Sequence, residues 1–462
     1  MPALARRLSQ ALPQAVLTLL AMLGTLACTQ WLEPGAASAV LGVVLSLSMA
    51  RSHLAGSPRG RLEALLALPV VSLASVGVGA LLRDAPWAGA TLFVGLMSLS
   101  IWMRRFGPLA LRAGSLIALP LVTLLVVPRL PQQGGGAASR VLMPVGIAVT
   151  ALVWVTVAEA FGRRLGWLAA QDAEAIDGDA HRAQPASTLR PAPHSRMALQ
   201  MGAALAAAFV IGRAFFPSHW SWIVLTAFIV NSGNRGRQDV LHKSALRIGG
   251  AAGGTIAALV LADAAPVHGA AAAMPILACV FLGVWLRPLG YGWWALFVTL
   301  ALALLQGLQP QAPLSLLLQR LVEIGIGAAL GLAAAWFVFP IRSTDVLRRR
   351  VADALAAMAE AMDPQVAERR PARVAAAIAR VEQLRPSFHA RHLALRRWQP
   401  LQPVDWIDAL VACREPAVAL VERGATPAAA RKAIGAARKA MREPAEIMAA
   451  LEQLRQALVG AA

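Results

Sequence analysis

The sequence predicts an all-helical membrane protein, and three observations support this fold class. Hydrophobic residues make up 58% of the 462 residues and charged residues 15%, against roughly 45–50% and about 25% in soluble domains. The hydrophobic residues gather into runs of about 17–25 residues, the length of helix that crosses a hydrocarbon core of roughly 30 Å. The period-two alternation typical of a membrane β-barrel is absent from these runs.

Twelve apolar stretches fill the first 340 residues, and each predicts one transmembrane helix. The first predicted domain, 1–164, contains the stretches 11–31, 36–51, 62–82, 87–103, 108–128 and 141–161. A second membrane domain, 197–340, contains the stretches 197–216, 220–232, 245–263, 268–286, 291–308 and 314–340. The stretch 220–232 is short for a membrane crossing, so we extend it toward Asn234.

The two groups of six stretches resemble each other, which predicts a duplicated six-helix unit. The motif Trp-x-Arg-x-x-Gly at Trp102–Gly107 recurs 183 residues later at Trp285–Gly290. Trp154 and Trp336, each in the sixth stretch of its half, are 182 residues apart. Because a pathway across the membrane often forms where two repeats meet, this layout is typical of a transporter.

The formal net charge of +19 is spread over alternate loops. The cation-rich loops contain Arg6, Arg7, Arg51, Arg59, Arg61, Arg104, Arg105, Arg163, Arg164, Arg235, Arg237, Lys243, Arg247, Arg287, Arg342 and Arg348–Arg350. The opposite loops are poor in cations, with exceptions at Arg83, Arg129, Arg140 and Arg213. Cytoplasmic loops retain Lys and Arg, so we predict that both termini are cytoplasmic. The anionic headgroups of a lipid bilayer stabilise such loops, so the charge does not indicate binding of nucleic acid.

Residues 165–196 are rich in acids and prolines and predict a cytoplasmic linker. His181 and His194 lie among these acids, but no helical spacing joins a histidine to an acid there. A solvated linker is therefore favoured over a metal site. The three cysteines, Cys28, Cys279 and Cys413, have no ligand spacing. The sequence thus predicts neither a metal nor a cofactor.

The remaining residues, 341–462, predict a cytoplasmic helical domain. Val346, Leu347, Val351, Leu355, Met358 and Met362 recur at helical spacing and form one apolar stripe. Further helices are predicted at 364–384, 387–398, 403–423 and 426–460, with breaks near prolines. The stripe fits packing within this domain and also packing against a second copy in a homodimer, and the sequence does not choose between them.

The segment His219–Val230 (HWSWIVLTAFIV) resembles the fusaric-acid-resistance-like (FUSC) or aromatic acid exporter family. In that family a Trp-containing helix with a Thr-Ala step, here Thr226-Ala227, precedes a basic cytoplasmic loop, here Gly233–Arg237. The next helix of the family opens with Arg, a hydrophobic residue and Gly-Thr, which matches Arg247-Ile248 and departs at Gly249-Gly250. Relatives often carry a cytoplasmic domain after each membrane half, whereas this chain has only the linker between its halves.

This resemblance implies export of small, often aromatic, organic anions across the bacterial inner membrane, with a periplasmic adaptor protein as a partner. We expect export driven by the proton gradient. Plant relatives include malate-conducting channels, so a passive anion channel of the same fold is an alternative. A membrane-embedded transferase is a weaker alternative. The sequence has no Walker motif, no G-x-S-x-G and no H-E-x-x-H, so we predict no catalytic residues and no enzyme.

Charged residues within the apolar stretches are candidates for substrate and proton binding. Arg247 fits a binding site for an organic anion, because guanidinium matches a carboxylate, and it equally fits a cytoplasmic anchor. Arg320 and Glu323 lie three residues apart on one helix face. They fit a local ion pair, or a site where Arg320 binds substrate and Glu323 couples proton movement.

Aromatic residues and glycines of the same half complete the candidate site. Trp220 and Trp222 fit the aromatic belt at a membrane surface and also stacking against an aromatic substrate, and we assign Thr226 to the same substrate site. The small residues Gly249, Gly250, Gly253 and Gly254 recur on one helix at i, i+3 and i+4 spacing. This pattern predicts close helix packing, with a backbone exposed to substrate as the alternative.

Overall fold

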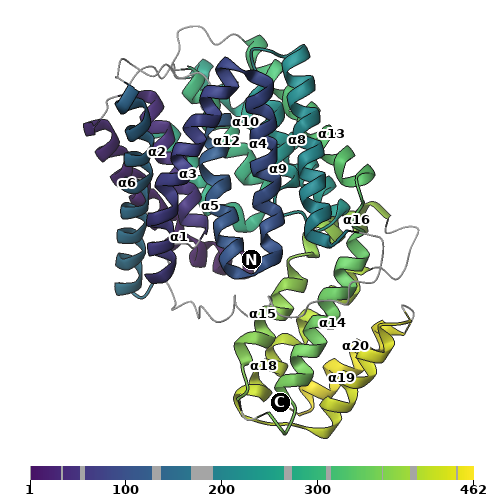
Figure 1. The fold of residues 1–462 in the computed structure, drawn as a ribbon. Coiled ribbons are helices and arrows are strands. Elements are labelled where there is room, and N and C mark those ends of the chain that lie inside the picture. The colour runs from purple at the N-terminus through teal and green to yellow at the C-terminus, as the bar shows by residue number, and fades with distance from the viewer. Residues whose placement is uncertain are drawn as a thin grey trace. The chain divides into compact units, whose positions relative to one another are not determined.

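The computed structural model describes the chain except for residues 1, 33–34, 53–57, 127–136, 168–190, 265–272, 308–313, 367, 396–402, 444–445 and 462. The described residues are almost entirely helical and divide into two compact units (Figure 1). Of the described residues, the membrane unit comprises those within 1–173, 179–232 and 243–339, and the tail unit comprises those within 233–242 and 340–462. Most of the predicted linker, 165–196, lies outside the described residues.

The first half of the membrane unit consists of helices that follow the first six apolar stretches. They are α1 (Pro2–Leu32), α2 (Ala36–Ser52), α3 (Pro58–Asp84), α4 (Pro86–Trp102), the 3-10 helix η2 (Met103–Phe106), α5 (Pro108–Val126) and α6 (Ala137–Arg164). Prolines open α3, α4 and α5, where the missing N–H costs no hydrogen bond.

The second half follows the other six stretches. Its helices are α8 (Pro193–Phe215), α9 (Trp220–Asn231), α10 (Arg237–Ala264), α11 (Ala273–Trp285), the 3-10 helix η4 (Arg287–Leu289), α12 (Tyr291–Gly307) and α13 (Leu314–Phe337). The expected extension of 220–232 toward Asn234 is wrong. Ser232 has an extended backbone with ψ of 129°, and Gly233 adopts a φ of 61°, so the helix ends at Asn231.

The helix lengths support a membrane protein without showing twelve crossings. Among the described residues, seven helices are long and apolar enough to span a membrane. Five shorter apolar segments, of 10–17 residues, are Ser38–Ala50, Ala113–Leu125, Trp220–Asn231, Ala273–Trp285 and Tyr291–Leu305. Each predicted stretch overlaps one helix, but twelve transmembrane passages remain a prediction.

The two copies of the Trp-x-Arg-x-x-Gly motif adopt the same local structure. Trp102 ends α4 before η2, and Trp285 ends α11 before η4. Each 3-10 helix is followed by a glycine with positive φ, 106° at Gly107 and 154° at Gly290, a region that L side chains avoid. The motif is therefore a turn that joins two apolar helices.

The same helix contacts occur in both halves of the membrane unit. Helices α1, α2 and α6 contact one another, as do α8, α9 and α13. Helix α4 of the first half packs against α8, and α11 of the second half packs against α1. Such an exchange is expected when two copies of one unit face each other, so the packing fits the predicted repeat, which itself remains a prediction.

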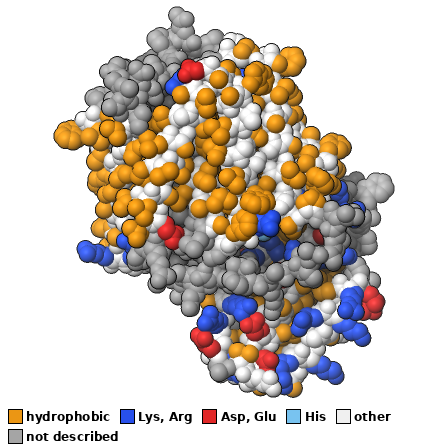
Figure 2. Space-filling model, viewed as in Figure 1, with side chains coloured by type: hydrophobic (Ala, Val, Ile, Leu, Met, Phe, Trp, Pro, Cys, Tyr) orange, Lys and Arg blue, Asp and Glu red, His pale blue; other side chains and the backbone are white. Residues whose placement is uncertain are grey.

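Large apolar side chains cover the exposed surface of the membrane unit. On α3, for example, Leu62, Leu66 and Val70 are all more than half exposed. Figure 2 shows hydrophobic side chains spread over this unit. A continuous apolar surface of this extent is unfavourable in water, whereas lipid tails solvate it without cost.

The tail unit is a helical domain with its own core. Its helices are α14 (Ser343–Ala361), α15 (Pro371–Glu382), α16 (Arg385–Leu395), α17 (Pro403–Ala412), α18 (Arg414–Glu422), α19 (Ala428–Ala440) and α20 (Ile447–Val459). In the predicted stripe of α14, Val346 is partly buried and the residues from Leu347 to Met362 are fully buried, and α14 packs against α15, α19 and α17. The stripe therefore packs within the tail, while a homodimer remains a prediction.

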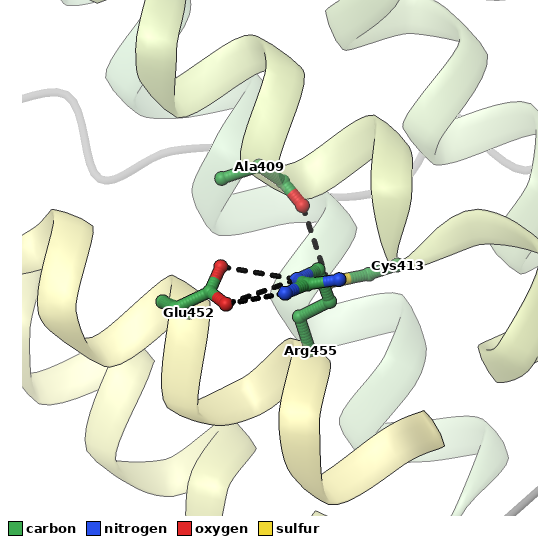
Figure 3. A network of polar contacts seen from close by, with 4 residues as sticks. All are labelled: Ala409, Cys413, Glu452 and Arg455. Carbon is green, nitrogen blue, oxygen red and sulfur yellow. Dashed lines mark hydrogen bonds and ion pairs between the residues drawn. The ribbon is translucent and has the colours of Figure 1, made fainter.

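Cys413 lies inside this tail core. Its Sγ is 3.3 Å from the carbonyl oxygen of Ala409, to which it donates, and Arg455 pairs with Glu452 beside it (Figure 3). Burial raises the pKa of the Cys413 thiol to about 12. The thiol therefore stays protonated near neutral pH and is a poor nucleophile.

Candidate functional site

Helix α9 packs directly against α13 and α8 in the second half of the membrane unit. Two glycines of α13 allow this approach. A Cβ at Gly327 would lie 2.4 Å from the carbonyl oxygen of Ile223, and one at Gly331 would lie 2.3 Å from Cγ2 of Val230. Most side chains of α9 are consequently buried, including those of Trp222 and Thr226.

Two charged residues of α13 are buried beside α9. Arg320 is 3% exposed and Glu323 is 1% exposed. The Arg320 guanidinium lies 3.7 Å from the centroid of the Trp222 ring, which is a close cation–π contact. Glu323 attracts the positive charge of Arg320. The structure thus brings together Trp222, Arg320 and Glu323.

His219 and Gln319 join this cluster from the start of α9 and from α13. His219 Nδ1 lies 3.9 Å from Glu323 Oε1 and 3.5 Å from Gln319 Nε2. The Glu323 oxygens have no hydrogen bond of normal geometry from a described residue. His219 is partly exposed, so it connects the buried carboxylate to the surface of the membrane unit.

Arg247 is the third charged residue of the cluster. The helix that carries it, predicted to start at 245, begins at Arg237, so Arg247 lies about 15 Å along the helix and not at its first turn. It is 2% exposed, and its charge repels that of Arg320. Within the described part of the chain, Arg247 has no ion pair, and its Nε has no hydrogen-bond partner.

Trp220, a candidate substrate residue, makes its ring contacts outside the cluster of Trp222, Arg320 and Glu323. Its ring contacts that of Phe209 in a tilted arrangement, with 5.2 Å between centroids, and the Arg213 guanidinium lies 4.5 Å from the Trp220 ring centroid. Both partners belong to α8.

Sequence reasoning did not assign His219, because its link to Glu323 depends on how α9 packs. The sequence offered one sign of a polar cluster that His219 could join, which was the presence of Gln319 and Glu323 four residues apart on one helix.

Three of the four candidate packing glycines on α10 lie against α12. A Cβ at Gly250 would lie 2.7 Å from the Gly292 carbonyl oxygen, and one at Gly254 would lie 2.4 Å from the Leu296 carbonyl oxygen. A Cβ at Gly253 would lie 3.2 Å from Leu296. Gly249 differs, since a Cβ there would have no neighbour within 4 Å.

The same substitution at two of these glycines should have opposite effects. Gly254→Ala forces its Cβ against the backbone of α12, and such overpacking costs about 1–3 kcal/mol. Gly249→Ala meets open space and should stabilise the helix by roughly 0.5–1 kcal/mol. Thermal unfolding of the detergent-solubilised protein, followed by tryptophan fluorescence, should therefore show a lower Tm for Gly254→Ala only. Equal Tm values for the two variants would contradict close packing at Gly254.

Comparison with known proteins identifies the domain that carries this cluster. No curated protein and no solved structure gives a significant match to the chain. Residues 204–334 match the family model described as fusaric acid resistance protein-like, and this range includes α9, α10 and most of α13. The resemblance inferred from His219–Val230 is confirmed: the second membrane half contains a fusaric acid resistance protein-like (FUSC) domain.

Proposed function

We propose that this protein is a bacterial inner-membrane exporter of small organic anions, chiefly aromatic ones, driven by the proton gradient. The apolar helices and the FUSC-like domain suggest a membrane transporter. The observation that carries the substrate class is the buried cluster around Arg247. It holds two buried guanidinium groups that repel each other, of which that of Arg320 lies over the Trp222 ring, and Arg247 has no counter-charge among the described residues.

A small aromatic carboxylate would supply the negative charge that Arg247 lacks among the described residues. An isolated buried cation is costly unless it is paired, and a carboxylate pairs with guanidinium through two hydrogen bonds. The Trp222 ring, which lies in contact with Arg320, presents an aromatic surface next to that cation. The carboxylate of the substrate would thus bind guanidinium, and its aromatic ring would contact Trp222.

Glu323 supplies the proposed link to protons. Its carboxyl and the substrate anion act on the same charge, that of Arg320. A proton on Glu323 therefore changes the affinity for the anion, and by linkage the anion changes the affinity for the proton. His219, partly exposed and 3.9 Å from Glu323, provides the route by which a proton reaches this buried group.

Flux measurements on the purified, full-length protein in liposomes test this function. Radiolabelled aromatic carboxylates are followed across an imposed pH gradient, with protein-free liposomes as the control. We expect flux of at least one carboxylate that depends on the gradient. Flux that follows voltage and ignores the proton gradient would instead establish the passive channel. No flux of any carboxylate with folded protein would overturn the aromatic-anion substrate class.

A further inference from the structure

Buried hydroxyl groups in the membrane unit usually bond to their own helix. Thr25 donates to the carbonyl oxygen of Ala21, Thr123 to that of Pro120 and Thr299 to that of Ala295. Ser75 and Ser100 donate to carbonyl oxygens three residues earlier. This bond to the preceding turn satisfies a hydroxyl where no water is present.

Three buried serine and threonine hydroxyls lack such a bond to any described residue, and all three belong to the FUSC-like domain. The Oγ atoms of Thr226, Ser244 and Thr255 have no hydrogen-bond partner among the described residues. Asn231 is similar, because its Nδ2 donates to the Ala227 carbonyl oxygen while its Oδ1 has no such partner. All four side chains are more than nine-tenths buried.

These four polar groups continue the helix faces that carry the anion cluster. On α10, Ser244, Arg247 and Thr255 recur at helical spacing with fully buried Ala251 between them. On α9, Thr226 lies one turn after Trp222, and Asn231 ends the helix. Lys243 of α10 donates to the Ser232 carbonyl oxygen at the end of α9, and the charge of Arg247 acts on Arg320 of α13, so α10 lies near both helices.

The polar groups lie on both sides of Arg247 along the helix axis. Ser244 lies toward the Arg237 end of α10 and Thr255 toward the other end, and their separation of eleven residue steps corresponds to about 16 Å along the helix axis. A buried polar atom without a partner costs about 1–3 kcal/mol. Water or a polar solute that bonds to these atoms removes that cost.

We infer that α9 and α10 line a hydrated path for the anion, in which Asn231, Ser244, Thr226 and Thr255 bind water and the polar groups of the substrate on either side of Arg247. The passage of an anion along this path rests on the proposed export function. The hydration itself does not, so it can be tested without a transport assay. A small organic anion that leaves the two guanidinium groups would then meet hydroxyl and amide groups in both directions.

Cysteine substitution measures this hydration directly. Ser244→Cys, Thr226→Cys and Thr255→Cys are made in the full-length protein and treated in liposomes with an anionic, water-soluble methanethiosulfonate. The modified peptides are quantified by mass spectrometry, so that the native cysteines do not interfere. Thr299→Cys on α12 is the matched control, since Thr299 is equally buried and its hydroxyl bonds to its own helix. We expect labelling at the three path positions to be at least about tenfold faster, because the reactive thiolate forms only in contact with water.

Equal labelling rates at the path positions and at Thr299→Cys would overturn the inference. If a cysteine variant fails to fold, the valine and alanine variants give a second measurement. Thr255→Val and Ser244→Ala should leave the Tm nearly unchanged, whereas Thr299→Val should lower it, because only Thr299 loses a bond within the protein. A larger loss at Thr255 or Ser244 than at Thr299 would contradict the hydrated path. Fast labelling without any anion flux would instead leave the path standing and count against the exporter.

Discussion

Arg247→Met should lose anion flux while the protein remains at least as stable as the unaltered chain. Loss of a charge-assisted hydrogen bond to the substrate costs about 1.5–3 kcal/mol, which is a roughly 10- to 150-fold fall in affinity. The free energy of unfolding should stay constant or rise, because methionine removes a buried charge that has no counter-charge among the described residues. Flux in liposomes and Tm in detergent measure the two effects on one sample.

The matched control is Arg163→Met in the first half. Arg163 forms an ion pair with Glu159 at 3.6 Å and is about one-third exposed, so its removal should change flux little. If Arg247→Met transports like the unaltered protein, Arg247 is an anchor and not a ligand for the anion. If the variant instead unfolds readily, Arg247 stabilises the fold, and the binding site has to be sought elsewhere.

Glu323→Gln should transport anions at a rate that no longer depends on the proton gradient. Glutamine keeps the size and hydrogen-bonding capacity of the protonated carboxyl but neither gains nor loses a proton. Glu323 is buried beside Arg320 and His219. We therefore expect this single change to remove the coupling of anion flux to the proton gradient, while the site still binds the anion. Flux is measured at several imposed pH gradients at constant voltage.

Glu159→Gln is the corresponding control, because Glu159 is also a largely buried glutamate but lies at the end of α6, paired with Arg163. It should retain the full response to the gradient. A Glu323→Gln variant that responds to the proton gradient as the unaltered protein does would remove Glu323 from the coupling mechanism.

The positions of the apolar helices could be predicted from the sequence, but their ends could not. Hydropathy marks the residues that lipid surrounds, so the stretch 245–263 was recognised. The first turns of α10, from Arg237 to Ser244, continue the same helix with only Val240 and Leu241 as apolar residues, too few to mark them by hydropathy. Similarly, the tail region 403–423 is two helices, α17 and α18, that meet at Cys413, because a short turn between two apolar helices leaves little trace in composition.

The charges of the candidate site were recognisable because they interrupt apolar stretches, as Arg320 and Glu323 do. Their partners depend on tertiary contacts that no spacing reveals. The contact of Arg320 with Trp222, and the contacts of Trp220 with α8, follow from the rotation of α9 against α13. Likewise, Gly249 and Gly250 are neighbours in the sequence, yet only Gly250 lies against α12.

The short length of α9 affects how the membrane voltage acts at the site. Its twelve residues extend about 18 Å, well below a hydrocarbon core of roughly 30 Å. Because neighbouring helices bury most of α9, its short length shortens the protein interior between its two ends and not the surrounding lipid. Under the proposed export, water at both ends of α9 would make the membrane voltage drop over this shorter distance. An anion on the proposed path would then gain its electrical energy, about 2.3 kcal/mol per 100 mV, over less than the full thickness of the bilayer.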